Sequence, residues 1–202
     1  GICIFLGALG THFYINEFIF PISIILITSF FILILGIWDD IKNLKSQTKL
    51  YIELILVTLT VYLTGIKVES LGYIFGFSYP LNLGFLSLPF TIIAVTGLTN
   101  AFNMIDGIDG QASVLTIISI IGLFFFGLPK IDPNFFIYLL TILAGLIPFL
   151  VFNIIPNKRI KVFLGDGGSL FLGYVIAFFL LYHTQTFTSL NMLRPGMTVS
   201  LG

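Results

Sequence analysis

Seven apolar segments, separated by short polar stretches, constrain this chain more than any other feature of its sequence. They lie at residues 1–15, 18–38, 49–65, 85–103, 111–128, 135–152 and 169–183. Each approaches the length of about 20 mostly apolar residues that a helix needs to cross the hydrocarbon layer of a membrane. Hydrophobic residues make up 57% of the chain and charged residues 9%, far from the composition of soluble domains. The sequence therefore predicts an all-α integral membrane protein, a polytopic helical bundle of about seven spans in one domain, residues 1–202.

The total charge and the start of the chain exclude several simpler interpretations. The formal net charge is zero, so nothing in it favours a nucleic-acid partner. Cys3 is the only cysteine, which excludes an internal disulfide, and its apolar surroundings predict a small packed side chain. The chain opens on Gly1 without a basic leader or a small-residue cleavage site, so we expect an internal start rather than a signal peptide. We therefore treat the sequence as part of a longer protein, incomplete at both ends.

Polar loops at residues 39–48, 104–110 and 153–168 share one face of the membrane if every expected span crosses it. The basic residues Lys42, Lys45, Lys49, Lys158, Arg159 and Lys161 belong to this face, and Lys67, Lys130 and Arg194 to the other. Cytoplasmic loops carry the excess of such residues, so we expect the shared face to be cytoplasmic. Five of the nine carboxylates lie there too: Asp39, Asp40, Asp106, Asp109 and Asp166. On the opposite face, residues 67–82 alternate weakly and predict a small hairpin.

The stretch NAFNMIDGIDG, residues 100–110, places amides and acids where an apolar helix ends. Asn100, Asn103 and Asp106 recur every three residues, so successive members are neighbours on a helix surface. The glycines that follow permit the helix to unwind, which would free Asp109 to turn toward the same pocket. Because amides both donate and accept hydrogen bonds, this surface suits a sugar or a nucleobase.

The other two loops of this face supply further oxygen ligands. Asp39 and Asp40 are adjacent, and a divalent cation relieves the repulsion between neighbouring carboxylates. Without histidine or cysteine nearby, such hard ligands favour magnesium, which typically takes one or two carboxylates and substrate phosphates. Asp166 lies within LGDGGS, where backbone N–H groups at a glycine-rich helix start could hold a phosphate. Together the three loops predict phosphoryl transfer on a substrate with a lipid tail.

Four other interpretations of these acids have to be weighed. Charges collect at helix ends simply because lipid excludes them, and acids can pair with nearby lysines at little gain in stability. An intramembrane aspartyl protease would require a glycine at Leu164, and it leaves the asparagines unexplained. A transporter or channel would carry acids in mid-span, where only Glu53 is a candidate. Acids on three loops of one face make an active site the stronger hypothesis.

The motifs GIWDD, NAFNMIDGIDG and FNIIPNKRIKVFLGDGGSLFLG together resemble those of the polyprenyl-phosphate N-acetylhexosamine-1-phosphate transferases, glycosyltransferase family 4. The resemblance implies a bacterial inner-membrane enzyme with a cytoplasmic active face, which moves a sugar phosphate from a UDP-sugar to undecaprenyl phosphate and releases UMP. It also implies Mg²⁺ as cofactor, with Mn²⁺ as a substitute, and a homodimer is a further expectation. The central motif and the basic NKRIK insertion are most similar to the branch that uses UDP-N-acetylglucosamine. The alternative is the branch that transfers phospho-N-acetylmuramoyl-pentapeptide.

The resemblance also implies roles for particular residues. The acids of the first two motifs would be catalytic, the last acid would bind the metal together with Asp40, and five residues would bind substrate. In full, the catalytic residues are Asp39, Asp40, Asp106 and Asp109, the metal ligands Asp166 and Asp40, and the substrate-binding residues Asn100, Asn103, Asn153, Phe163 and Lys49. Phe163 would stack on uracil, with Asp109 and Asn153 near the base.

This sequence departs from the family pattern at several points. Asn43 replaces a third acid of the first motif, and Gln111 replaces a leucine that commonly follows the second. The histidine-rich loop of the family is absent, and His12 and His183 fall at the outer ends of their spans.

Two mechanisms fit: direct attack of the lipid phosphate on the β-phosphorus, or a covalent phosphosugar on an Asp. Direct attack is favoured, because a phosphate monoester with a second pKa near 6 is already mostly ionised at about pH 7.

Overall fold

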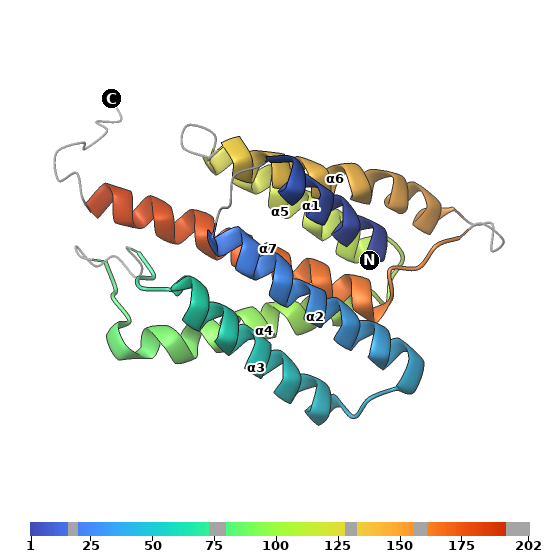
Figure 1. The fold of residues 1–202 in the computed structure, drawn as a ribbon, viewed down its shortest axis with the longest axis horizontal. Coiled ribbons are helices and arrows are strands. Elements are labelled where there is room, and N and C mark those ends of the chain that lie inside the picture. Colours follow the sequence, from blue (N-terminus) through green and yellow to red (C-terminus); the bar gives the residue numbers. More distant parts are fainter. Residues whose placement is uncertain (16–19, 73–79, 128–132, 156–160, 193–202) are drawn as a thin grey trace.

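A computed structural model of the chain describes residues 1–15, 20–72, 80–127, 133–155 and 161–192. Within these ranges the chain forms seven α-helices and one short 3-10 helix (Figure 1). The α-helices are α1 (Ile2–Ile15), α2 (Phe20–Lys42), α3 (Ser46–Thr64), α4 (Ser87–Ile105), α5 (Gln111–Gly127), α6 (Pro133–Ile154) and α7 (Gly165–Met192), and the 3-10 helix η1 (Gly84–Leu86) precedes α4. The helices coincide with the seven expected spans to within a few residues at most ends, so the prediction of an all-α membrane protein is confirmed.

The helices differ in how well each one alone would suit a membrane. Four are long and apolar enough to cross it: Phe20–Lys42, Gly84–Ile105, Asn134–Ile154 and Gly165–Gln185. The apolar helices α1 and α5 are shorter, and α3 carries Lys49 and Glu53 within its first two turns. The two charged residues of α3 therefore need partners on the neighbouring helices.

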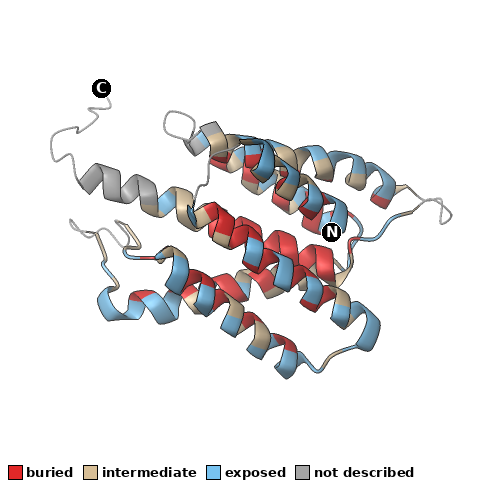
Figure 2. Cartoon of the chain, in the orientation of Figure 1, coloured by how far each residue is buried: buried red, intermediate tan, exposed pale blue. Residues whose placement is uncertain are grey.

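The α7 helix forms the centre of the bundle (Figure 1). It packs most extensively against α2 and α4 and also contacts α5 and α1. Residues 167–179 of α7 are buried on every side, whereas the helices around it expose many large apolar side chains outward (Figure 2). Exposed examples are Ile27, Tyr51, Ile55, Ile93, Ile118 and Ile147. A buried centre inside an apolar exterior is the arrangement that a lipid surround requires.

Glycines bring α7 unusually close to its two main neighbours. A Cβ at Gly36 of α2 would overlap the backbone of Gly167 in α7. A Cβ at Gly173 of α7 would lie 2.8 Å from the Cβ of Phe102 and 3.0 Å from the Cα of Thr99, both in α4. Small residues at such contacts let helix backbones approach each other inside membranes.

The helices α2, α4 and α6 all finish at the right-hand end of Figure 1, where α3, α5 and α7 begin. We call this the acidic end, because Asp39, Asp40, Asp106, Asp109 and Asp166 all lie there. The structure thus confirms that the three acidic loops share one end of the bundle. Lys158 and Arg159, which were expected beside them, and Lys130 and Arg194, expected at the other end, lie outside the described residues.

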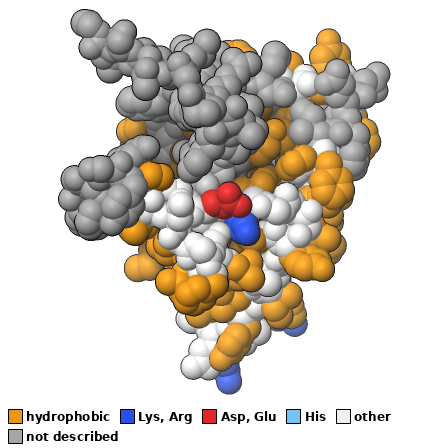
Figure 3. Space-filling view, turned by 90° about the vertical axis from the view of Figure 1, so that its left-hand side faces the viewer, with side chains coloured by type: hydrophobic (Ala, Val, Ile, Leu, Met, Phe, Trp, Pro, Cys, Tyr) orange, Lys and Arg blue, Asp and Glu red, His pale blue; other side chains and the backbone are white. Residues whose placement is uncertain are grey.

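The opposite end has little described charge. The described part of its face is largely hydrophobic or uncharged, with a small red and blue patch near the centre of Figure 3. Lys67 and Glu69 at this end lie 3.9 Å apart, and both side chains are exposed. Backbone hydrogen bonds from Leu71 to Leu81 and from Leu83 to Glu69, each 2.9 Å, pair the two sides of the expected hairpin. Its tip, residues 73–79, lies outside the described residues.

Candidate functional site

Lys49, in the first turn of α3, joins three helices at the acidic end. Its Nζ atom donates to Asp39 Oδ2 of α2 at 2.8 Å and to Asp166 Oδ2 of α7 at 3.0 Å. The side chains of Lys49 and Asp39 are 9% and 12% exposed, whereas that of Asp166 is 38% exposed. Removing one member of a buried ion pair typically costs about 3–5 kcal/mol, since the other charge then lacks a partner. Lys49 is therefore a largely buried cation, and Asp166 is the most exposed member of its ion pairs.

Asn103 adds α4 to this arrangement. With its amide oriented so that both polar atoms are satisfied, Nδ2 donates to Asp166 Oδ1 and Ser169 Oγ, each at 3.0 Å, and Oδ1 accepts from Lys49 Nζ at 2.5 Å. Ser169 Oγ in turn donates to the Gly165 carbonyl at 3.1 Å. We refer to Asp39, Lys49, Asn103, Asp166 and Ser169 as the Lys49 cluster. Four helices, α2, α3, α4 and α7, contribute to it.

Asp40 caps the start of α7. Its carboxylate accepts hydrogen bonds from the backbone N–H of Asp166 at 3.0 Å and of Gly167 at 3.3 Å. Acceptors at a helix N-terminus satisfy otherwise unpaired N–H groups and interact favourably with the helix dipole. These N–H groups were expected to hold a phosphate, but two of them already donate to a carboxylate of the chain itself. That Asp40 also binds a metal stays a prediction.

Asp106 lies just beyond the last turn of α4 and is half-buried. No described residue donates a side-chain hydrogen bond to its carboxylate. Burial, followed by the charge of Asp166, raises the pKa of the Asp106 carboxyl to about 6. The helix unwinds here as the glycines predict, and Gly110 adopts a φ of 74° that only glycine accepts readily. Asp106 is thus an acid that a nearby cation would stabilise.

Asp109 turns away from the Lys49 cluster toward the segment before α7. Its Oδ2 pairs with Lys161 Nζ at 2.5 Å, and the same ammonium lies 5.3 Å from the centroid of the Phe163 ring. The Phe163 side chain is 70% exposed. Asn153 of α6 donates from Nδ2 to the Val162 carbonyl at 2.8 Å and so fixes this segment. We refer to Asp109, Asn153, Lys161 and Phe163 as the Lys161 group, and the roles expected for them around uracil stay predictions.

The structure therefore places seven of the ten expected site residues in these two groups, leaves Asp40, Asp106 and Asn100 outside both, and adds residues to the site. Asn100 lies one turn before Asn103 in α4 and donates a hydrogen bond to Glu53 of α3. This hydrogen bond lies one helical turn further from the acidic end than the Lys49 cluster. Glu53, Lys161 and Ser169 were not among the expected site residues. Glu53 could have been found from its position, because a carboxylate one turn beyond a lysine in an apolar helix indicates a site. For Lys161 and Ser169 the sequence holds no comparable signal, since a basic loop residue and a helix-start serine are common.

The acidic end suits a magnesium ion in its donor chemistry. Within the described ranges, no three acidic, histidine or cysteine side chains come together as a ready-made metal cage. Magnesium does not require one, because it usually takes one or two carboxylates and completes its shell with water and substrate phosphate. Asp166 is partly exposed, and Asp106 lacks a hydrogen-bond donor from the described chain. The residues present therefore fit a hard divalent cation.

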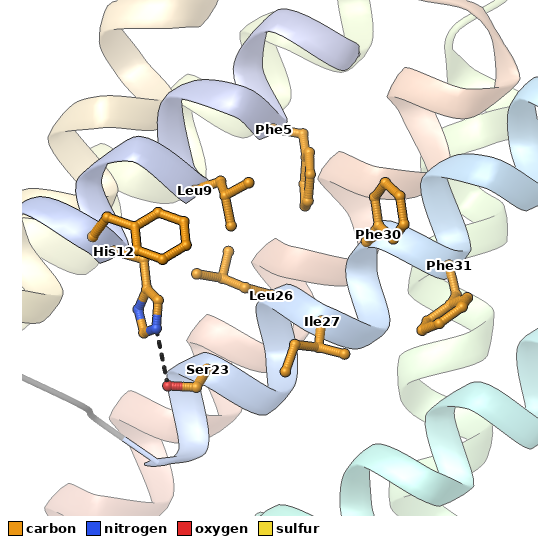
Figure 4. Close-up of a pocket in the computed structure, with 9 residues that line it drawn as sticks. Phe5, Leu9, His12, Ser23, Leu26, Ile27, Phe30 and Phe31 are labelled. Atoms are coloured by element: carbon orange, nitrogen blue, oxygen red, sulfur yellow. Dashed lines mark hydrogen bonds between the residues drawn. The ribbon is translucent and has the colours of Figure 1, made fainter.

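An apolar cavity of about 430 Å³ lies elsewhere, between α1 and α2 (Figure 4). Phe5, Leu9, Leu26, Phe30 and Phe31 are among the residues that line it, and at one end Ser23 hydrogen-bonds to His12 at 3.3 Å. No acid or lysine lines this cavity. Along α2, Asp39 lies eight residues beyond Phe31, about 12 Å at the rise of an α-helix. The cavity is therefore separate from both polar groups.

A family model described as glycosyl transferase family 4 matches residues 22–184, which is most of the chain. The chain belongs to glycosyl transferase family 4. The matched residues run from α2 into α7 and include every member of the Lys49 cluster and of the Lys161 group. Both groups are therefore part of the region that defines membership of glycosyl transferase family 4.

Relatives within glycosyl transferase family 4 carry specific names. The chain is 33% identical over 181 residues to a Bacillus subtilis (strain 168) protein named "Probable undecaprenyl-phosphate N-acetylglucosaminyl 1-phosphate transferase". It is 31% identical over 190 residues to the "Undecaprenyl-phosphate alpha-N-acetylglucosaminyl 1-phosphate transferase" of Escherichia coli (strain K12). These matches cover 88% and 92% of the chain, and 48% and 50% of the relatives. The chain spans about half the length of the curated relatives it matches.

Proposed function

We propose that this protein transfers N-acetylglucosamine 1-phosphate from UDP-N-acetylglucosamine to undecaprenyl phosphate and releases UMP. The Lys49 cluster is the observation that carries the proposal. It places a buried cation, two carboxylates and an amide from four helices at one end of a membrane bundle. That is where a lipid phosphate anchored in the bilayer would meet a water-soluble sugar nucleotide. The names of the bacterial relatives support the sugar and the lipid.

The reaction joins two phosphates and needs little covalent help from the protein. The lipid phosphate attacks the β-phosphorus of the donor, a phosphorus–oxygen bond forms, and the bond from that phosphorus to UMP breaks. Lys49 neutralises charge that develops on the transferred phosphoryl group, and Asp39 and Asn103 hold its ammonium in place. The lipid phosphate is already mostly ionised at neutral pH, so direct attack does not depend on a general base. Asp39 is accordingly assigned to orienting Lys49.

Magnesium would be held by Asp166, together with Asp106 or Asp40. It would supply positive charge to the donor diphosphate, and Mn²⁺ would substitute for it. Asp106 and Asp166 are the favoured pair, because both oxygens of Asp40 accept backbone N–H groups of α7. Asp166→Asn should accordingly lower turnover by orders of magnitude in a protein that stays folded.

The Lys161 group is assigned to the nucleoside end of the donor. The exposed Phe163 ring offers a flat face for uracil, and Lys161 holds Asp109 beside that ring. Asn153 fixes the segment that carries the ring. We further propose that the acidic end faces the cytoplasm across a bacterial inner membrane, because the sugar-nucleotide donor would be found there. The expected homodimer stays a prediction.

The experiment uses membranes that contain the protein, supplied with undecaprenyl phosphate and UDP-N-acetylglucosamine labelled in the sugar. The expected result is a labelled polyprenyl diphosphate sugar together with UMP, dependent on added magnesium. Release of UDP would contradict the proposal, because it would mean transfer of the sugar without its phosphate. Product formed only from a UDP-N-acetylmuramoyl-pentapeptide would identify the alternative branch. Flux of the donor across vesicles without any lipid product would instead indicate a transporter.

A further inference from the structure

Glu53 is a fully buried acid that the proposed reaction does not use. It lies in α3 four residues after Lys49, and its exposed fraction is 0%. One carboxylate oxygen, Oε2, accepts a hydrogen bond from Asn100 Nδ2 of α4. The other, Oε1, is buried and has no hydrogen-bond partner among the described residues. A buried polar atom without a partner is costly, so its retention calls for a reason.

The contacts around Glu53 form two levels between α3 and α4. At the upper level Lys49 of α3 meets Asn103 of α4, and at the lower level Glu53 meets Asn100. Residues that are three or four positions apart lie on the same face of a helix. The Glu53–Asn100 pair therefore lies one helical turn away from the Lys49–Asn103 pair. Asn100 Nδ2 also donates to the Thr96 carbonyl of its own helix at 3.0 Å. Of these two hydrogen bonds of Asn100, the one to Glu53 is the one that joins α4 to α3.

The burial of Glu53 favours a role in hydrogen bonding over a role in charge. A substrate cannot reach its carboxylate as the helices are packed here, because the Glu53 side chain is fully buried. Its negative charge is expensive at this depth, and Lys49 is already paired with Asp39 and Asp166. What the carboxylate does supply is an acceptor that fixes the Asn100 amide and hence the face of α4 that carries Asn103.

We propose that Glu53 is a positioning residue for phosphosugar transfer: through Asn100 it sets the alignment of α3 and α4 that brings Asn103 to Lys49. This inference rests on the proposed function for its kinetic consequences, whereas the alignment itself can be measured without any reaction. Because the role needs only an acceptor, glutamine should perform it and leucine should not. Small displacements of positioned groups reduce turnover strongly, so the loss should appear in kcat rather than in the KM for the donor.

The kinetic experiment compares Glu53→Gln and Glu53→Leu with the unaltered protein in the labelled-sugar assay. Glu53→Gln should retain kcat within about twofold, and Glu53→Leu should lose about tenfold or more at an unchanged donor KM. Asn100→Leu should cause a similar loss, and the double variant should lose little more than either single variant. Glu69→Leu is the matched control, because it removes the same group from the exposed opposite end and should leave kcat unchanged. Thermal unfolding of each variant shows whether the fold persists.

The alignment experiment needs no substrate. Cysteines replace Leu50 of α3 and Met104 of α4, the exposed neighbours of Lys49 and Asn103, in a Cys3→Ser background, and a bifunctional thiol reagent links them in the purified protein. Cross-linking should be equally fast with Glu53 and with Glu53→Gln, and about tenfold slower with Glu53→Leu, because the lower level then no longer aligns the helices. Equal rates in all three, or a Glu53→Gln variant as impaired as Glu53→Leu, would overturn the inference. Absence of lipid product from the unaltered protein would instead count against the proposed function alone.

Discussion

Asp106 shows how a functional acid can work against the stability of the fold. Burial and the nearby charge of Asp166 raise the pKa of its carboxyl from 3.8 to about 6. The folded protein therefore holds the proton more tightly than the unfolded chain does. The contribution of protonated Asp106 to stability is complete below about pH 4, falls as the pH rises, and is lost above about pH 6. At neutral pH the ionised Asp106 lowers the stability of the folded protein, and its proposed role in function accounts for its presence.

Replacing Asp106 with asparagine should remove that cost. In detergent with a chelator present, Asp106→Asn should unfold at a higher temperature than the unaltered protein above pH 6 and at the same temperature near pH 4. Transferase activity should nonetheless fall. Added magnesium should narrow the difference at neutral pH, since a divalent cation favours the charged acid. The same difference in midpoint at both pH values would contradict the assignment of the effect to ionisation of Asp106.

At the scale of helices, the contact between α2 and α7 fixes the acids that those helices carry. Gly36 and Gly167 touch backbone to backbone, and Asp40 binds the first N–H groups of α7 only four residues further along α2. The same contact leaves Asp39 facing Lys49, which also holds Asp166. The helix pair is therefore a single unit for the placement of three carboxylates.

A side chain at Gly36 should disturb that unit. Gly36→Ala would force its Cβ against the backbone of Gly167 and Asp166, and overpacking of this kind costs about 1–3 kcal/mol. We expect a lower unfolding temperature together with reduced turnover. Gly97→Ala in α4 is the matched control, because nothing lies within 4 Å of its added Cβ. If the two substitutions had equal effects, the loss would come from replacing any helix glycine and not from the contact between Gly36 and Gly167.

The positions of the helices were easier to predict from the sequence than the contacts between them. Apolar length located all seven helices, because a span must be both long and free of unpaired charge. The apolar span was expected from Ser169, with a glycine-rich helix start just before it, and α7 begins at Gly165. The GDGG stretch is typical of a loop, and the acceptor that lets it begin a helix is Asp40, 126 residues earlier in the chain. Helix ends that depend on a distant cap cannot be found from local sequence.

At the scale of the whole molecule, the alternation of the helices brings five acids to one end but does not determine which of them meet. The sequence predicted one pocket for Asn103, Asp106 and Asp109. In the structure Asp109 pairs with Lys161, whereas Asn103 hydrogen-bonds to Asp166 and Lys49. The partner of each acid depends on how far each helix is rotated about its own axis, and glycine contacts restrict that rotation between α7 and its neighbours α2 and α4. The buried link from Glu53 to Asn100 likewise depends on the packing of α3 against α4.

The orientation of the bundle can be tested by thiol labelling. In a Cys3→Ser background, single cysteines at Ser46 and Gly107 should react with an impermeant reagent from the cytoplasmic side only. A cysteine at Glu69 should react from the outside only, because it lies at the opposite end of the bundle. Labelling of Ser46 and Gly107 from different sides would contradict the shared acidic end and, with it, a common site.

The central position of α7 has a consequence for how mutations in this protein would be tolerated. Residues 167–179 have no outward face, so a library of random substitutions should be depleted of larger and of polar side chains along that whole stretch. The lipid-facing positions of α3 should accept almost any apolar residue. Since α7 begins at Gly165 and carries Asp166 in its first turn, a packing fault deep in the membrane and a fault in the chemistry would produce the same phenotype. Genetic screens alone would therefore overstate the size of the active site.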